Sequence, residues 1–289
     1  PFDPGTALGL AHGETVAMKQ KGLARYLLNA VLLIVAVAWL GPYLWMVLGS
    51  FKSLKDIMNA PLAPLPSAFH GEAYAEVFRS IPVGRYLLNT TVMALSIAAL
   101  QIMLVLPAGY ALAKLRFVGR GAAFLTVMAC LLIPAQVTFV PVFLMLAQVK
   151  LVNTMTALVL PFGASALGTF MVRQALLAIP DELIEAARLD GASELTIVYR
   201  ILAPMLAPTL ASLFLLSFVF HWNDYFWPLV MTTDESVRTM PLAVALLREQ
   251  GTGVRWHIVM AGNVILSAPA LFVFAMTQKH LLRAVAARR

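Results

Sequence analysis

The amino-acid sequence predicts an all-α membrane protein with six transmembrane helices. Of its 289 residues, 61% are hydrophobic and 12% are charged, whereas soluble domains average about 45–50% apolar and about 25% charged residues. Long apolar runs recur along almost the whole chain, and a membrane-spanning helix needs about 20 such residues. The runs are continuous and do not alternate with a period of two, which favours helices over membrane-spanning strands.

Six segments have the length and composition of a span, and each contains at least one proline. Proline removes a backbone hydrogen bond, and membrane helices accommodate the resulting kink. Such kinks suit a protein that opens and closes a path, and they are equally compatible with a role in packing alone. The predicted spans cover residues 27–48, 87–113, 121–146, 154–177, 203–231 and 257–278.

The connections between these spans are unequal in length. One side of the membrane holds the connections at residues 49–86, 147–153 and 232–256. The other side holds those at 114–120 and 178–202. Most of the 21 Lys and Arg residues fall on the second side, together with both termini. Positively charged loops favour the cytoplasm. We therefore expect both termini to be cytoplasmic in a multi-pass protein.

The chain divides into one membrane domain with two short flanks. We expect a flexible cytoplasmic N-terminus at residues 1–26, a transmembrane domain at 27–281 and a cytoplasmic tail at 282–289. Residues 1–17 are polar, contain several Gly and Pro residues, and lack the pattern of a secretory signal. Met18 resembles a natural start, so we expect residues 1–17 to be an upstream extension that is not native.

The formal net charge of +7 does not indicate a nucleic-acid-binding protein. Its Lys and Arg residues lie between apolar runs, where membrane topology and anionic lipid headgroups explain them. A nucleic-acid site would form a dense basic stripe on a polar domain. The single cysteine, Cys130, lies in an apolar run, so the chain contains no disulfide framework and no cysteine-based metal site.

The loop at 178–202 has the pattern of a helix, a tight turn and a second helix. Pro180 precedes two acids, and proline and acidic residues are both favoured in the first turn of a helix. Gly191 stands where this helix should end, since glycine readily adopts a left-handed backbone. Ser193 is a suitable N-cap for the next helix.

The first helix of this loop has the features of a docking element. Ala186 and Ala187 are small enough to allow close packing against another surface, and Glu185 and Arg188 can pair with charges on it. No cytoplasmic domain of this chain is available to receive the helix, so a partner protein is implied. The alternative is an amphipathic helix that lies on the bilayer.

The loop resembles the EAA loop of binding-protein-dependent ABC importer permeases. The matching residues are Glu185-Ala186-Ala187, Gly191 and Ile201-x-Ala203-Pro204, with Ala203 in place of the leucine usual in the family. Further matches, which resemble the MalG-like members of the carbohydrate-uptake class over residues 27–280, are Ser50-Phe51-Lys52, Asn89-Thr90, Ala108-Gly109-Tyr110-Ala111-Leu112-Ala113-Lys114, Arg116-Phe117, Leu160-Pro161, Phe170, Arg173-Gln174, Trp222-Asn223-Asp224 and Pro228-Leu229.

This resemblance implies the type I ABC importer permease fold in a bacterial inner membrane. It also implies a coupling helix that docks in a cleft of the ATPase. The partners would be two ATP-binding cassette subunits, a second homologous permease, an extracytoplasmic solute-binding protein and the lipid bilayer. The solute would be a sugar, a glycoside or a related polyol. The residues expected to couple the chain to the ATPase are Glu185, Ala186, Ala187, Arg188, Asp190 and Gly191.

No catalytic, metal or cofactor site is expected in the chain itself. It lacks the Gly-x4-Gly-Lys-Ser/Thr phosphate loop, so ATP and Mg would be bound by the partner ATPase. Its five histidines are scattered, and no clustered catalytic set points to a membrane-embedded enzyme. An ion-gradient-driven secondary transporter is the alternative, but it predicts acidic residues in mid-span, and the spans contain almost none.

Five polar or aromatic residues are candidates for lining a solute path. Trp222, Asn223 and Asp224 lie near the outer end of the fifth predicted span, and Asn89 and Gln136 lie in the second and third. Aromatic faces and a carboxylate within the membrane suit a polar solute. An interfacial aromatic belt explains the first three equally well, and hydrogen bonds between helices explain the last two.

Overall fold

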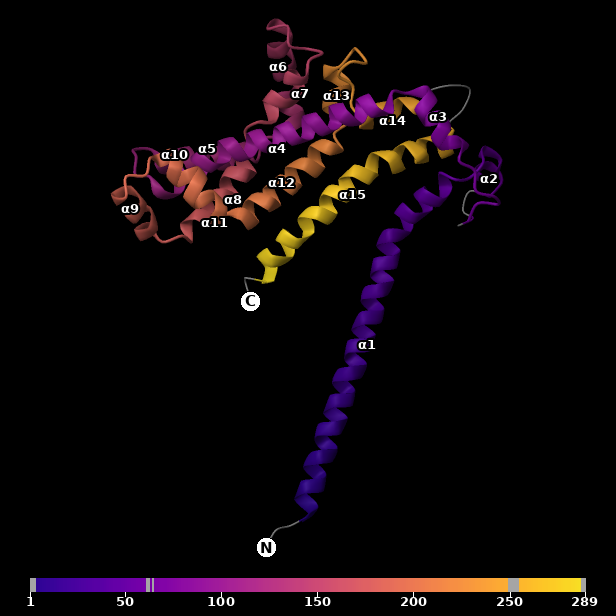
Figure 1. Ribbon diagram of the computed structural model, residues 1–289, viewed down its shortest axis with the longest axis vertical. Helices are drawn as coiled ribbons and strands as arrows, with labels where there is room; N and C mark the ends of the chain where they lie inside the picture. The colour runs from indigo at the N-terminus through magenta and orange to yellow at the C-terminus, as the bar shows by residue number, and fades with distance from the viewer. Residues whose placement is uncertain (1–3, 61–62, 64, 249–254, 287–289) are drawn as a thin grey trace.

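The computed structural model describes the backbone of residues 4–60, 63, 65–248 and 255–286, and the side chains within 25–60, 63, 65–134, 136–248 and 255–278. Every regular element in these ranges is helical (Figure 1). The elements are α1 Pro4–Gly49, α2 Leu54–Asn59, α3 Glu72–Ser80, α4 Val83–Lys114, α5 Arg120–Cys130, α6 Ala135–Gln148, α7 Met155–Val159, η1 Leu160–Phe162, α8 Ala166–Leu177, α9 Asp181–Leu189, α10 Glu194–Thr196, η2 Ile197–Leu202, α11 Ala203–Met205, α12 Ala207–Trp222, α13 Phe226–Met231, α14 Met240–Leu247 and α15 Trp256–Ala286.

Three of the predicted spans are continuous helices. Three helical segments are each long and apolar enough to cross a membrane: Arg25–Gly49 of α1, the whole of α4 and Trp256–Gln278 of α15. These helices confirm the spans expected at 27–48, 87–113 and 257–278. The helix α1 begins at Pro4, well before the first expected span. The flexibility of residues 1–26 and the domain boundaries at 26 and 281 stay predictions.

Two further spans are bent. The fourth consists of Met155–Phe162 and Ala166–Leu177, which meet at 44°; Ser165 caps the second helix by accepting a hydrogen bond from the Gly168 amide at 3.0 Å. The fifth begins with Glu194–Met205, which meets Ala207–Trp222 at 85°. Among the described residues there are therefore three continuous spans, or up to five when each bent pair counts as one.

The third predicted span, 121–146, is wrong as a continuous helix. It is divided into α5 and α6, each shorter than a membrane crossing, with a turn at residues 131–134 between them. Pro134 has an extended backbone (φ −63°, ψ 135°) and provides no amide donor. It also disfavours helical geometry at the residue before it. Hydropathy alone does not detect this break, because the turn itself is apolar.

The core is organised around α4, which lies along the bundle beside α8, α12 and α14 (Figure 1). Side chains of α4 enter all three clusters of buried apolar residues. At one end they pack with α8, α9 and η2, and at the other with α3, α12, α14 and α15. A third cluster joins the middle of α4 to α7 and α13.

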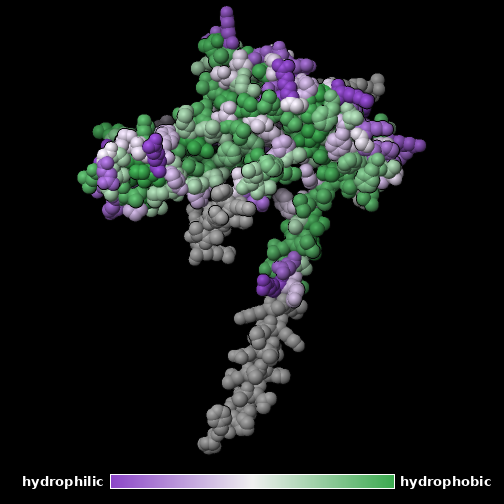
Figure 2. Space-filling view, viewed as in Figure 1, coloured by the Kyte–Doolittle hydropathy of each residue, from purple (hydrophilic) through white to green (hydrophobic). Residues whose placement is uncertain are grey.

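The face of the helices shown in Figure 2 is largely apolar, as expected for contact with lipid or another membrane subunit. The helix α1 diverges from the bundle, and only the C-terminal end of α1 approaches α15 (Figure 1). There the hydroxyl oxygens of Tyr43 and Ser267 lie 3.3 Å apart. Trp39, ten residues before the end of this helix, is 82% exposed.

The close approach of α4 and α8 depends on Gly109. A Cβ atom at this position would lie 2.6 Å from Val172 Cγ1 and 3.2 Å from the Arg173 backbone nitrogen. Because backbone atoms cannot move aside, the two helices would have to separate. Gly121 of α5 is a matched control, since a Cβ there meets nothing within 4 Å.

We predict that Gly109→Ala destabilises the protein by about 1–3 kcal/mol, the usual range for an overpacked core. Gly121→Ala should be neutral or slightly stabilising, because alanine favours a helix more than glycine does. Thermal unfolding of both variants in detergent measures the difference. A Gly109→Ala variant as stable as the unmodified chain would contradict the close packing of α4 and α8.

Candidate functional site

The loop that joins α8 to α12 forms a helix that projects from one end of the bundle (Figure 1). Pro180 precedes α9 with an extended backbone, and Asp181 and Glu182 lie in its first turn. Arg188 lies in the last turn, where a cation interacts favourably with the helix dipole. The helix expected to open with Pro180 and the two acids is present, but it begins one residue later, at Asp181, with Pro180 as its N-cap.

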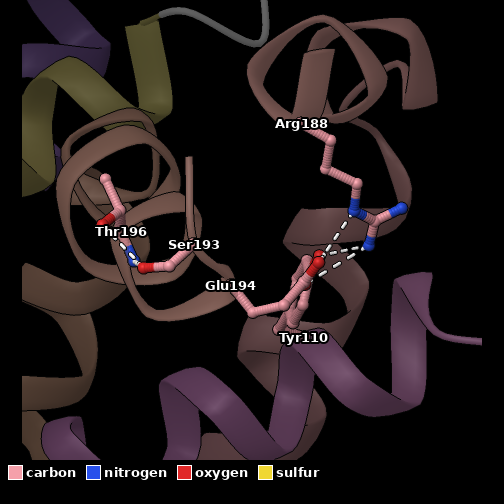
Figure 3. A network of polar contacts seen from close by, with 5 residues as sticks. All are labelled: Tyr110, Arg188, Ser193, Glu194 and Thr196. Carbon is pink, nitrogen blue, oxygen red and sulfur yellow. Dashed lines mark hydrogen bonds and ion pairs between the residues drawn. The ribbon is translucent and has the colours of Figure 1, made fainter. Parts of the chain in front are cut away.

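The end of α9 is a glycine-dependent turn of the Schellman type. Gly191 has a φ of +82° and donates to the Arg188 carbonyl at 3.0 Å, and Ala192 donates to the Ala187 carbonyl at 3.0 Å. Ser193 then caps α10, because its hydroxyl accepts a hydrogen bond from the Thr196 amide at 3.3 Å (Figure 3). The predicted order of helix, glycine turn and helix is confirmed.

Opposite faces of α9 have different environments. Ile184 and Ala187 are 3% and 9% exposed and pack in the cluster formed with α4 and α8. Glu185, Ala186 and Asp190 are exposed. The expectation that Ala187 presents a surface to a partner is therefore wrong, because helical spacing places it beside Ile184 on the inner face. Of the two alanines, Ala186 is available for contact.

Arg188 is also directed towards its own chain, although we expected it to pair with a partner's charges. Its Nε atom donates to Glu194 Oε1 at 2.8 Å and its Nη2 donates to the Tyr110 hydroxyl at 2.9 Å (Figure 3). The Tyr110 hydroxyl donates to Glu194 Oε2 at 2.5 Å. The hydrogen bond to Glu194 raises the pKa of Arg188.

The start of α9 is held by a second contact from α4. Lys114 donates to the Ile179 carbonyl at 2.5 Å and to Asp181 Oδ1 at 2.6 Å. The Lys114 side chain is 7% exposed, whereas that of Asp181 is 70% exposed. The hydrogen bond and the charge of Lys114 lower the pKa of Asp181. The C-terminal end of α4 therefore contacts both ends of α9, through Lys114 and Tyr110.

The proposed solute-path residues do not form one lining. Trp222 is only 1% exposed, and its Nε1 donates to the Leu266 carbonyl of α15 at 3.0 Å. It is a core residue, so its assignment to a path is wrong. The Asn89 side-chain nitrogen donates to the carbonyls of Ser236 and Arg238, both at 2.9 Å. Asn89 thus holds the segment that precedes α14.

The other three candidates lie where α6 meets α13. Asn223 is exposed and donates to the Val219 carbonyl at 2.8 Å, while Asp224 Oδ1 accepts from the Trp227 amide at 3.2 Å and so caps the first turn of α13. Gln136 is exposed in the first turn of α6. The two helices are in contact through Phe139, whose ring centroid lies 5.0 Å from that of Phe226.

Comparison with known proteins decides the family. Residues 105–287 match the family described as "Binding-protein-dependent transport system inner membrane component". The chain belongs to this family. The predicted resemblance to binding-protein-dependent importer permeases is thereby confirmed at the level of the family, and the chain is a permease component. The alternative of an ion-gradient-driven transporter is displaced.

Curated relatives agree with this family assignment. The sn-glycerol-3-phosphate transport system permease protein UgpE of Yersinia pestis bv. Antiqua (strain Antiqua) is 32% identical over 240 residues, which is 80% of this chain and 85% of the relative. The arabinooligosaccharides transport system permease protein AraQ of Halalkalibacterium halodurans is 30% identical over 269 residues, which is 91% of this chain and 95% of the relative.

The fold is that of an importer permease. A crystal structure of a bacterial ABC transporter involved in the import of the acidic polysaccharide alginate contains a chain that superposes with a TM-score of 0.77. The sequences are 24% identical, and the superposition covers 88% of this permease and 95% of the other chain. The predicted fold class is confirmed, although a count of six spans is not.

Sequence reasoning missed Tyr110, Lys114 and Glu194 as site residues of this permease. Tyr110 and Lys114 were recognised only as parts of a family motif. Their spacing of four residues places them on one face of α4, which is the signal that could have drawn attention to them. Within the described residues, no group of three or more His, Cys, Asp or Glu side chains could hold a metal ion.

The lowered pKa of Asp181 predicts how the loop responds to pH. A carboxylate with a depressed folded-state pKa stabilises the structure above its unfolded pKa and loses that contribution as the pH falls through the folded value. The contacts of α9 should therefore be intact between about pH 5 and about pH 8 and weaken below about pH 4.

Hydrogen exchange of residues 181–194, corrected for the intrinsic exchange rate at each pH, measures this response. We expect constant protection in the upper range and a loss of protection under acid conditions before the α4 core opens. Loss of protection between about pH 7 and about pH 6 would contradict this prediction, since the Asp181 carboxylate does not titrate there.

Proposed function

We propose that this permease forms one half of the membrane pathway for a sugar, a glycoside or a related polyol in an ATP-driven importer. Separate ATPase subunits would drive it by moving α9. The exposed outer face of α9 carries this proposal, because the inner face is anchored on α4 and α8 while Glu185 and Ala186 face away from the bundle.

Several features of α9 suit docking to an ATPase. Leu189 is 89% exposed and Leu183 is 39% exposed, so the charged outer face also presents apolar side chains. In a typical protein interface, apolar side chains lie in the desolvated centre and charged or polar side chains lie at the rim. ATP and Mg would be held by the ATPase subunits.

A second permease is supported by the exposure of α1. Its apolar side chains from Tyr26 to Trp45 make few contacts with the rest of the chain, and Trp39 is 82% exposed. Lipid covers part of such a helix, and another membrane subunit can cover the rest. The proposed complex is therefore two permeases, two ATPase subunits and one solute-binding protein.

The proposed docking of an ATPase on α9 requires one orientation in the membrane. With α9 in the cytoplasm, the basic turn after α4 is cytoplasmic too, and both termini lie on this side of the bacterial inner membrane, as the positive-inside rule favours. The segments around α2, α3 and α14 then face outwards and would receive the solute-binding protein. We propose that Gln136, Asn223 and Asp224 face the solute near the outer end of the path.

An oxygen-rich solute is the best-supported substrate class. The relatives are named for arabinooligosaccharides and sn-glycerol-3-phosphate. Amide and carboxylate side chains at the junction of α6 and α13 bind hydroxyl groups, and the neighbouring rings of Phe139 and Phe226 can stack on a sugar ring.

We predict that Glu185→Lys weakens ATPase binding at least about tenfold, because reversing a charge at an interface costs several kcal/mol. Recovery of ATPase subunits with the tagged permease from nanodiscs measures this effect. Glu72→Lys is the matched control, since Glu72 is an exposed acid at the start of α3 on the opposite side.

The unmodified complex should also hydrolyse ATP faster when the loaded solute-binding protein is added. Recovery of this chain without any ATPase would contradict the proposed function. Equal recovery of ATPase with Glu185→Lys and with Glu72→Lys would contradict docking through the outer face of α9.

A further inference from the structure

Helix α4 is fastened to a polar segment at each of its ends. At the cytoplasmic end, Tyr110 and Lys114 contact the residues that begin and end α9. We call this set the inner clasp; it consists of Tyr110, Lys114, Asp181, Arg188 and Glu194. At the other end is the outer clasp, which consists of Asn89, Thr90, Ser236, Arg238 and Met240.

The inner clasp joins three elements through one buried phenol. Tyr110 is 3% exposed, and its hydroxyl meets both the guanidinium of Arg188 and the carboxylate of Glu194 (Figure 3). The Gly191 turn brings the last two side chains together although they lie on different helices. The exposed ion pair between Arg188 and Glu194 adds little stability by itself. Because both side chains also contact the buried Tyr110 hydroxyl, the pair is suited to positioning the end of α9 against α4.

The outer clasp fixes the segment between α13 and α14. The amide of Asn89 donates to two carbonyls of this segment, each at 2.9 Å. One residue further along α4, the Thr90 hydroxyl accepts from the Met240 amide at 2.8 Å and is completely buried. These bonds attach the start of α14 to α4 by its backbone as well as by packing.

Helix α4 between the clasps is one continuous helix and is buried on several sides by the core clusters. Pro107 lies within it and cannot donate to the Met103 carbonyl. The Tyr199 hydroxyl donates to this carbonyl instead, at 2.7 Å. A helix transmits displacement along its length because its backbone hydrogen bonds resist stretching, and packed interfaces switch between discrete arrangements rather than deform gradually.

We propose that α4 is a connecting rod, with the inner and outer clasps as its attachment points, so that movement of α9 displaces the external segment 232–240 directly. Tyr110, Lys114, Arg188 and Glu194 are positioning residues at one end, and Asn89 and Thr90 are positioning residues at the other. This inference rests on the proposed docking of an ATPase on α9. It assigns Asn89 to coupling and not to the solute path.

The first test measures ATP hydrolysed per solute transported by the complete complex in proteoliposomes. Arg188→Glu and Glu194→Arg each place like charges together and should raise this ratio about 2- to 30-fold, the range expected for residues that carry coupling. The double variant restores an opposite pair and should return the ratio towards that of the unmodified complex. Recovery of this kind would not follow from a general loss of stability.

Single-atom changes provide a matched pair for the same assay. Tyr110→Phe removes the hydroxyl of the inner clasp and should raise the ratio. Tyr43→Phe removes a hydroxyl that joins α1 to α15 and contacts no clasp residue, so it should leave the ratio unchanged. At the outer end, Asn89→Ala should raise the ratio while ATPase recovery stays normal.

The second test measures whether the two clasps move together. Spin labels at Leu195→Cys and Thr233→Cys, both exposed positions, are introduced in a Cys130→Ser background. In the unmodified complex the distance between the labels should stay constant when ATP binds. With Tyr110→Phe or Asn89→Ala it should change or broaden, because one end of the rod is released.

The two levels of the hypothesis fail in different ways. If the unmodified permease recovers no ATPase, the proposed docking fails. If the complexes assemble and the clasp variants retain the normal ATP-to-solute ratio, the connecting rod is overturned. A label distance that changes on ATP binding in the unmodified, fully coupled complex also overturns it, whereas a constant distance that is lost in the variants supports it.

Discussion

The close packing of α4 against its neighbours is the constraint on which the rest of the structure depends. Gly109 lets α8 approach α4 so closely that a single added carbon would meet Val172 and the backbone of Arg173. The position of α8 in turn determines where α9 begins. The orientation of α9 is then completed by Tyr110 and Lys114, which lie within the next turns of the same helix.

The balance of buried and exposed polar groups explains why α9 is both fixed and available. Its inner face is attached by apolar packing and by contacts whose α4 partners are almost fully buried, so α9 has a defined position without a partner. The outer face retains Glu185 and Ala186 in solvent. A rigid, exposed element of this kind binds without a large loss of conformational entropy.

Hydropathy and local turn chemistry were sufficient to predict the fold class, most spans and the helix–turn–helix form of the loop between α8 and α12. They succeeded at Pro180, Gly191 and Ser193 because each acts through its own backbone or its immediate neighbours. They failed at residues 131–134, where the chain turns within an apolar run that hydropathy does not distinguish from helix.

The orientation of individual side chains was harder to predict than the helices that carry them. Trp222 and Ala187 both face inwards because of packing with segments distant in sequence. Arg188 was recognised as important, but its partner Tyr110 lies 78 residues away. A single sequence provides apolar content and spacing, whereas the rotation of a helix about its axis depends on all of its neighbours.

Cross-linking from α9 is the most direct test of the central claim that this helix docks on an ATPase. A benzophenone maleimide attached at Ala186→Cys, in a Cys130→Ser background, should cross-link to the ATPase on illumination of the purified complex. The same reagent at Thr233→Cys, an exposed position at the other end of the bundle, should not. An ATPase adduct from position 233 and none from position 186 would contradict docking through α9.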